Sequence, residues 1–136
     1  MSTQIILTIV QGSSEGEEFV FEEKTECVVG RADCDIYLPR SSGHLDVSRR
    51  HCLFEIDPPL VRVRDLGSLH GTFVNGEKIG QRSSMYRPAS IDRRDFPAHE
   101  LKDGDEVQIG ESVIRVGIRV ASDVWDSGQV VAAYHR

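Results

Sequence analysis

The sequence is poor in cysteine and contains no long apolar run. Its 136 residues include three cysteines, Cys27, Cys34 and Cys52, an odd number without CxxC spacing. Such a set indicates neither a disulfide framework nor a zinc site, and we expect Cys27 and Cys52, which lie inside apolar runs, to be small buried side chains. The N-terminal apolar run at residues 5–10 is too short for a membrane span or for the core of a signal peptide. We therefore expect a cytoplasmic chain that does not contact a membrane.

Negative charge exceeds positive charge, with 22 Asp and Glu against 16 Lys and Arg. The formal net charge is −6 at pH 7, so we do not expect a broad electrostatic contact with the phosphates of DNA or RNA. The histidines and cysteines show no metal-ligand spacing either. We predict neither a nucleic-acid partner nor a metal or other cofactor.

The motifs of common enzyme classes are missing as well. The chain has no G-x-S-x-G elbow, no G-x-G-x-x-G loop and no H-R-D triplet. Asp46, Ser48 and His51 do have the residue types of a hydrolytic triad. A triad, however, needs a geometry in which the histidine bridges the other two groups, and closeness in sequence does not provide it. We therefore predict that the protein is not an enzyme.

What the chain does contain is a series of short β-branched segments separated by turn signals. No stretch keeps a helical period over several turns. The predicted strands are Gln4–Val10, Glu17–Glu22, Cys27–Gly30, His51–Ile56, Val61–Asp65, Thr72–Val74, Glu106–Ile109 and Ser112–Val120. Within residues 61–65 the alternation predicts that the valines face one way and the arginines the other. Many short strands in one domain-sized chain predict an antiparallel sandwich or barrel.

Three stretches do not fit the strand pattern. Residues 39–47 form a long polar connection, and residues 81–100 are predicted to be a long loop. Loops of that length in a compact domain are usually functional or mobile. Residues 121–136 are predicted to be a C-terminal extension or a linker.

The most informative residues lie in the remaining loops. Arg31 follows a predicted strand, Ser48 and Arg49 precede another, and a turn at 68–71 leads into a predicted hairpin at Asn75-Gly76. A sandwich collects its loops at its two ends, so these residues can meet. Guanidinium groups, a hydroxyl and backbone N–H groups beside glycines would suit a phosphate.

Three short motifs in this order resemble the forkhead-associated (FHA) domain. They are GR at residues 30–31, SRRH at 48–51 and DLGSLHGTFVNG at 65–76. The resemblance implies an FHA domain over residues 1–120, folded as an all-β, two-sheet antiparallel sandwich of about eleven strands. It also implies binding of phosphothreonine in an extended segment of a partner protein or peptide, in signalling by a Ser/Thr kinase in the same or another chain.

The resemblance assigns a role to individual residues. Arg31 would bind the phosphate or the peptide beside it, Ser48 would hydrogen-bond a phosphate oxygen, and Arg49 would add a further donor. The residues expected to support the site are Gly30, His51, Gly71, Asn75 and Gly76.

Two positions of the expected phosphopeptide site depart from the family pattern. The family usually has serine or threonine followed by asparagine directly before Gly-Thr, whereas this chain has Leu69 and His70. The leucine cannot donate to a phosphate, and the histidine differs from asparagine in reach and protonation. The alternative function is therefore a phosphate-independent interaction scaffold, which would bind a partner through another face or through the 81–100 loop.

Overall fold

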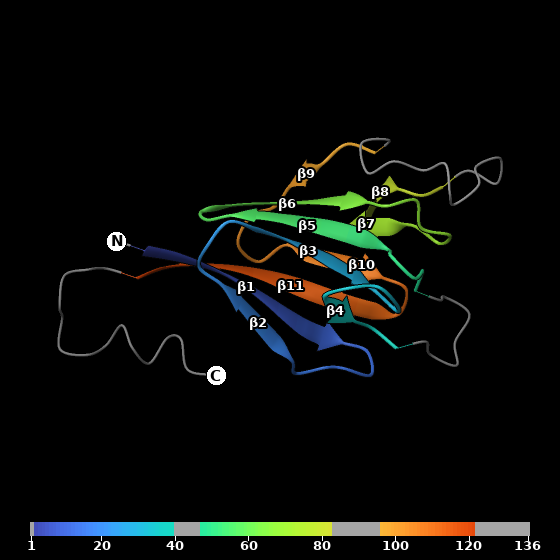
Figure 1. The fold of residues 1–136 in the computed structure, drawn as a ribbon, viewed down its shortest axis with the longest axis horizontal. Coiled ribbons are helices and arrows are strands. Elements are labelled where there is room, and N and C mark those ends of the chain that lie inside the picture. The colour runs from blue at the N-terminus through green and yellow to red at the C-terminus, as the bar shows by residue number, and fades with distance from the viewer. Residues whose placement is uncertain (1, 40–46, 83–95, 122–136) are drawn as a thin grey trace.

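The chain folds into two largely antiparallel sheets that pack face to face. The computed structural model describes residues 2–39, 47–82 and 96–121, and every element in these ranges is a strand. The six-stranded sheet has the spatial order β2-β1-β11-β10-β7-β8, and the five-stranded sheet has the order β4-β3-β5-β6-β9 (Figure 1). This two-sheet sandwich confirms the fold class expected from the sequence.

The strands of the six-stranded sheet are β1 (Ser2–Gln11), β2 (Glu18–Phe21), β7 (Thr72–Val74), β8 (Glu77–Gly80), β10 (Glu106–Ile109) and β11 (Ser112–Ala121). The strands of the five-stranded sheet are β3 (Thr25–Gly30), β4 (Ile36–Tyr37), β5 (Cys52–Asp57), β6 (Leu60–Asp65) and β9 (His99–Glu100). All pairs are antiparallel except β3 with β4, which run parallel.

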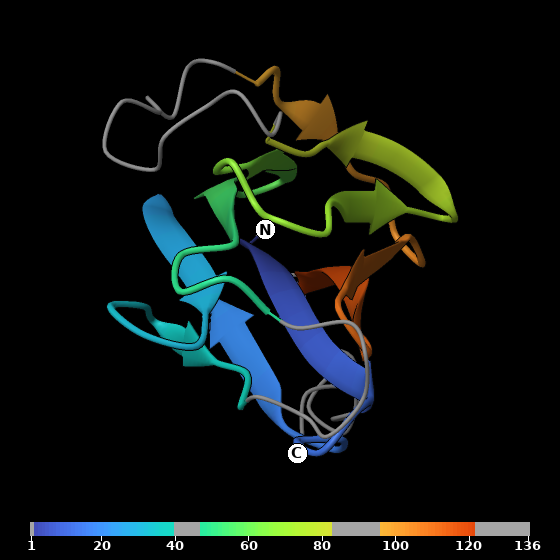
Figure 2. The ribbon, with the colours of Figure 1, turned by 90° about the vertical axis from the view of Figure 1, so that its right-hand side faces the viewer.

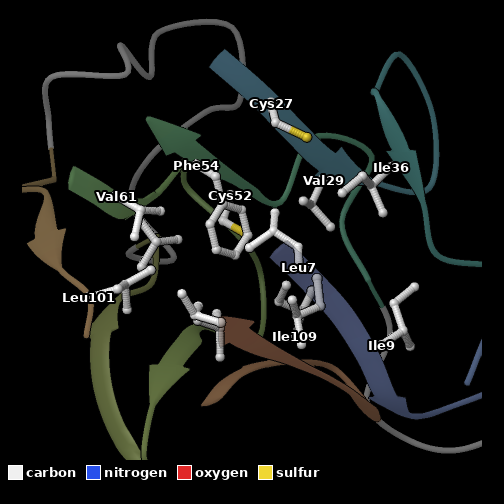
Figure 3. Close-up of a cluster of buried hydrophobic side chains, with 14 of the residues drawn as sticks. Leu7, Ile9, Cys27, Val29, Ile36, Cys52, Phe54, Val61, Leu101 and Ile109 are labelled. Carbon is white, nitrogen blue, oxygen red and sulfur yellow. The ribbon is translucent and has the colours of Figure 1, made fainter. Parts of the chain in front are cut away.

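Alternating side chains explain how these strands form a core. On β6, Val61 and Val63 are fully buried, whereas Arg62 and Arg64 remain partly exposed on the other face, as the sequence predicted. The inward-facing side chains of both sheets interdigitate around Phe54 (Figure 3). Cys27 and Cys52 belong to this cluster and are free thiols, which confirms their predicted burial. Burial raises the pKa of the Cys27 thiol to about 12, so it stays protonated at neutral pH.

Two strands, β4 and β9, were not predicted, and each is only two residues long. The bounds of β8 were not predicted either, although the expected hairpin at Asn75-Gly76 implies a strand there. The prediction of a loop over residues 81–100 is wrong at its end, because His99 and Glu100 pair with Val63 and Arg62 of β6. A two-residue strand has no alternation of its own, and its position depends on the neighbour it pairs with.

Several predicted features lie outside the described residues. They include Asp46, most of the 39–47 and 81–100 connections, and residues 122–136 of the proposed C-terminal extension. In the described part of the chain, no helix is long and apolar enough to cross a membrane.

The topology brings one set of loops to a single end of the sandwich. The last residues of β3, β6 and β8 lie at this end, together with the first residues of β5 and β7, and Figure 2 views the molecule from this side. The loops that carry the FHA-like motifs therefore meet although they are distant in sequence.

Candidate functional site

The candidate site is built from the segments that follow β3 and precede β5. The backbone N–H of Arg31 lies 3.2 Å from the carbonyl oxygen of Ser48 and 3.0 Å from that of Arg49, and donates to both. A Cβ atom on Gly30 would lie 1.9 Å from the carbonyl oxygen of Arg49. Only glycine allows this approach, so Gly30 lets the two segments touch and places Arg31 beside Ser48.

The side chain of Arg31 is anchored at its base. Its Nε donates to the carbonyl oxygen of Val47 at 3.0 Å, and the residue is partly buried. No other hydrogen bond of this guanidinium is made with the part of the chain that the structure describes. Among the described residues its terminal nitrogens therefore have no hydrogen-bond partner, and the bond of Nε to Val47 orients the side chain.

Ser48 is fixed by two hydrogen bonds, one within its own segment and one to the loop before β7. Its hydroxyl oxygen accepts a hydrogen bond from the backbone N–H of Leu69 at 3.0 Å, and its own N–H donates to Nδ1 of His51 at 3.1 Å. A serine hydroxyl accepts and donates at once. With Leu69 as donor, the hydroxyl proton of Ser48 can point toward an anion.

His51 links the segment before β5 to the loop before β7. The imidazole is fully buried, and its Nε2 lies 2.8 Å from the carbonyl oxygen of Gly71. Because Nδ1 accepts from Ser48, Nε2 carries the proton and donates to Gly71. Burial lowers the pKa of His51, so the neutral ring that this geometry requires is the stable form.

These bonds also bear on the triad alternative. His51 uses Nδ1 for the backbone N–H of Ser48 and Nε2 for Gly71, rather than for the serine hydroxyl. A general base must reach the proton that it abstracts. The observed geometry is that of a structural histidine.

Asp65 organises the loop between β6 and β7 through a network of hydrogen bonds that was not predicted. Its Oδ2 accepts from the N–H groups of Gly67 and Ser68 at 2.7 and 2.9 Å. Its Oδ1 accepts from the hydroxyls of Ser68 and Thr72 at 2.5 and 2.7 Å. Ser68 in turn accepts from the N–H of Gly71 at 2.9 Å, where φ is +97°. An aspartate at the start of a turn with glycine two residues on, as in an Asx turn, was the signal that could have revealed this network.

The loop presents Leu69 and His70 at the rim of the site. The leucine side chain is 48% exposed, and the histidine is partly buried. Gln81, which the sequence analysis missed, donates from Nε2 to the carbonyl oxygen of Leu69 at 2.6 Å. The N–H of Arg82 donates to the carbonyl oxygen of Ser68 at 2.9 Å. The segment after β8 therefore borders the site, together with the segment after β3, the segment before β5 and the loop before β7.

Arg49 lies at the outer edge of the site. Its guanidinium forms an ion pair of 3.3 Å with Asp33, and both side chains are largely exposed, at 65% and 72%. Exposure leaves Arg49 free to change partners. It is a second cation near Ser48, next to Arg31.

Asn75 and Gly76 lie away from these loops. They form the tight turn between β7 and β8, with φ values of +50° and +88°. The Asn75 side chain bonds Asp105 and the N–H of Glu106. In the β7–β8 register this turn is at the end opposite Gly71, so the structure does not bring these two residues to the candidate site.

The geometry defines a two-sheet β-sandwich whose loops bring Arg31, Ser48 and Arg49 together at one end. Comparison with known families agrees: the FHA domain family matches residues 27–110. The chain belongs to the FHA domain family.

Relatives in actinobacteria share this similarity over most of the chain. The glycogen accumulation regulator GarA of Mycolicibacterium smegmatis is 31% identical over 110 residues, covering 81% of this chain and 56% of that protein. An oxoglutarate dehydrogenase inhibitor of Corynebacterium glutamicum is 31% identical over 106 residues, covering 78% of this chain and 59% of the relative. The chain thus spans little more than half the length of these relatives.

Solved structures show the same fold. One, from work on phosphothreonine-dependent FHA domain interactions, is 26% identical with a TM-score of 0.63, covering 86% of this chain and 98% of the other. The kinase-interacting FHA domain of an Arabidopsis kinase-associated protein phosphatase is 22% identical with a TM-score of 0.66, covering 90% and 98% of the two chains. At that identity the second comparison shows the fold alone.

Proposed function

We propose that this chain is a non-catalytic, cytoplasmic module that binds phosphothreonine in partner proteins. The observation that carries the proposal is the junction of Arg31 and Ser48, in which a backbone contact places an anchored guanidinium beside an oriented hydroxyl. Charged planar donors and a neutral donor are what a phosphate with several acceptor oxygens requires.

Discrimination against the unmodified partner follows from charge. Phosphorylation adds about −1.5 to −2 charges at pH 7, together with strong acceptor oxygens. The terminal nitrogens of Arg31 would bind these oxygens, Ser48 would donate its hydroxyl proton, and Arg49 would add a second cation. An unphosphorylated threonine offers none of these interactions, so phosphorylation acts as a docking signal.

The preference for threonine over serine rests on a smaller free energy than the recognition of the phosphate. One methyl group supplies only about 1 kcal/mol by burial, and the shape of its contact adds to that. Phosphate recognition therefore supplies most of the affinity, and the methyl contact refines it.

The names of the relatives suggest a setting for this docking. GarA is named a regulator of glycogen accumulation, and the corynebacterial relatives are named inhibitors of oxoglutarate dehydrogenase. We infer that this chain docks onto a partner protein in Ser/Thr-kinase signalling, and that the partner or the kinase itself carries the phosphothreonine.

Calorimetric titration tests the proposal. The probes are a degenerate phosphothreonine peptide pool and its unphosphorylated twin, each titrated into the wild type, Arg31→Ala and Arg115→Ala. The control arginine lies on β11 in an exposed ion pair with Glu106, so its removal changes the net charge equally and leaves the site intact.

We expect phosphate-dependent binding that Arg31→Ala weakens by at least about 100-fold and Arg115→Ala leaves within about twofold. Near-normal affinity in a folded Arg31→Ala variant would overturn the site assignment.

A second candidate rests on Leu69, whose apolar side chain is 48% exposed at the rim. It would suit a phosphate-independent scaffold. Equal binding of both peptide pools would favour that function.

A further inference from the structure

One acidic side chain lies at the edge of the candidate phosphate site. The carboxylate of Asp33 is 3.3 Å from a terminal nitrogen of Arg49. Arg49 follows Ser48 directly, and its carbonyl oxygen accepts the backbone N–H of Arg31. Asp33 therefore contacts one of the groups assigned to the phosphate, Arg49, which lies next to the other two, Arg31 and Ser48.

Asp33 is held in place by its own loop. Its φ is +53°, a left-handed conformation that aspartate tolerates better than most residues. The loop is closed at its far side by Asp35, whose N–H donates to the carbonyl of Val28 and whose side chain accepts the Val28 N–H, both at 2.8 Å. Asp33 thus projects from a braced loop toward Arg49.

The charges of Asp33 and Arg49 neutralise each other only in the free protein. A phosphate at Arg31 and Ser48 would attract the guanidinium of Arg49, because a dianion offers more charge than a carboxylate. Asp33 would then lose its partner and remain 72% exposed beside the bound segment. An unpaired carboxylate in that position attracts cations and repels anions.

We propose that Asp33 is a specificity-determining residue, which selects phosphothreonine segments carrying a lysine or arginine close to the phosphothreonine. This inference rests on the proposed function. In the free protein Asp33 pairs with Arg49; in the complex Arg49 turns to the phosphate and Asp33 accepts the basic side chain of the ligand. Segments with an acidic residue at the same position are disfavoured.

The exchange costs little affinity. Exposed ion pairs contribute weakly, so releasing Arg49 from Asp33 is expected to reduce phosphopeptide affinity only about two- to fivefold. A basic residue in the ligand restores a factor of similar size. The expected effect is therefore a preference among phosphorylated segments, on top of recognition that depends on the phosphate.

The test uses fluorescence anisotropy with a set of synthetic peptides. Each has one phosphothreonine in an alanine- and serine-based sequence, with a single lysine, alanine or glutamate at one of the three positions on either side, and each has an unphosphorylated twin. The proteins are the wild type, Asp33→Asn and Glu77→Gln. Asparagine also tolerates a positive φ, and Glu77 is an exposed carboxylate at the start of β8, at the far end of the hairpin.

We expect at least one position at which the wild type binds lysine about threefold or more tighter than alanine and binds glutamate more weakly still. In Asp33→Asn this ranking should disappear, and the alanine peptide should bind about two- to fivefold tighter than to the wild type. Glu77→Gln should keep the wild-type ranking.

Two results would overturn the inference. If Asp33→Asn binds in a phosphate-dependent manner with the same lysine preference as the wild type, or if the wild type shows no such preference, the role of Asp33 is refuted and the proposed function stands. If no peptide binds through its phosphate in any sample, the proposed function fails and this inference fails with it.

Discussion

The carbonyl oxygen of Gly71 accepts a hydrogen bond from Nε2 of His51 at 2.8 Å, and this bond joins two loops of the site through the interior of the protein. The other ring nitrogen accepts from the backbone N–H of Ser48. A protonated ring has two donors and no acceptor. Protonation of His51 would therefore break the bond to Ser48, which makes the site dependent on a neutral histidine.

Stability is accordingly expected to fall in mild acid. Burial, the largest cause, lowers the pKa of His51 in the folded chain, whereas an unfolded histidine titrates near pH 6.5. The unfolded chain then binds more protons below about pH 6.5, so the free energy of unfolding decreases as the pH falls through the folded-state pKa. Urea unfolding from about pH 7.5 to about pH 5 measures this.

His51→Gln provides the reference for that titration. It should be about 2 kcal/mol less stable at neutral pH, because Ser48 and Gly71 lose well-placed partners. Its free energy of unfolding should also depend less on pH over the same range. An identical pH dependence in both proteins would show that His51 is not the titrating group.

Gly30→Ala should damage both the fold and the site. The added methyl would lie 1.9 Å from the carbonyl oxygen of Arg49, a backbone atom that cannot move without separating the two segments. We expect a loss of about 3 kcal/mol in the free energy of unfolding, measured with urea. Gly117→Ala is the matched control, because its methyl would meet Ile6 at an ordinary 3.5 Å. Equal stability of the two variants would contradict the close approach.

Asp65→Asn tests the buried network behind the rim. Asparagine has one acceptor oxygen and an amide donor, whereas the carboxylate of Asp65 accepts from two N–H groups and two hydroxyls. The substitution should cost about 2 to 4 kcal/mol of stability. Asp57→Asn, the same change at an exposed position, should stay within about 0.5 kcal/mol. Thermal unfolding of both variants makes the comparison, and a stable Asp65→Asn would show that the network is dispensable.

Much of this architecture could be predicted because it depends on local rules. The alternation on β6 identified its buried face, and the Asn75-Gly76 pair identified a hairpin through its need for positive φ. The family resemblance implied only that Gly30 supports the site, and the close approach there was not predicted, since nothing in the local sequence shows which backbone atom faces a glycine.

The remainder of the site depends on contacts between distant segments. Gln81 reaches the carbonyl of Leu69 only because β7 and β8 return the chain to the same end of the sandwich. The ion pair of Asp33 and Arg49 likewise requires the backbone contact between their loops. Exposed polar residues in loops carry no periodic signal, so their partners could not be read before the fold was known.

Leu69→Thr should strengthen binding of a phosphothreonine peptide. The backbone N–H of Leu69 already bonds the hydroxyl of Ser48, so the residue lies beside the proposed phosphate position, and its side chain is exposed. A threonine hydroxyl there would supply a further hydrogen bond to a charged group, and we expect affinity to rise about tenfold. Leu69→Val is the matched control, because valine has the shape of threonine without the hydroxyl.

Calorimetry with the same peptide measures the affinity of both variants. Since the position is exposed, their free energies of unfolding should agree within about 0.5 kcal/mol. If both variants bind with equal affinity, the side chain at this position does not face the phosphate, and the departure from the family pattern at Leu69 costs the site no contact.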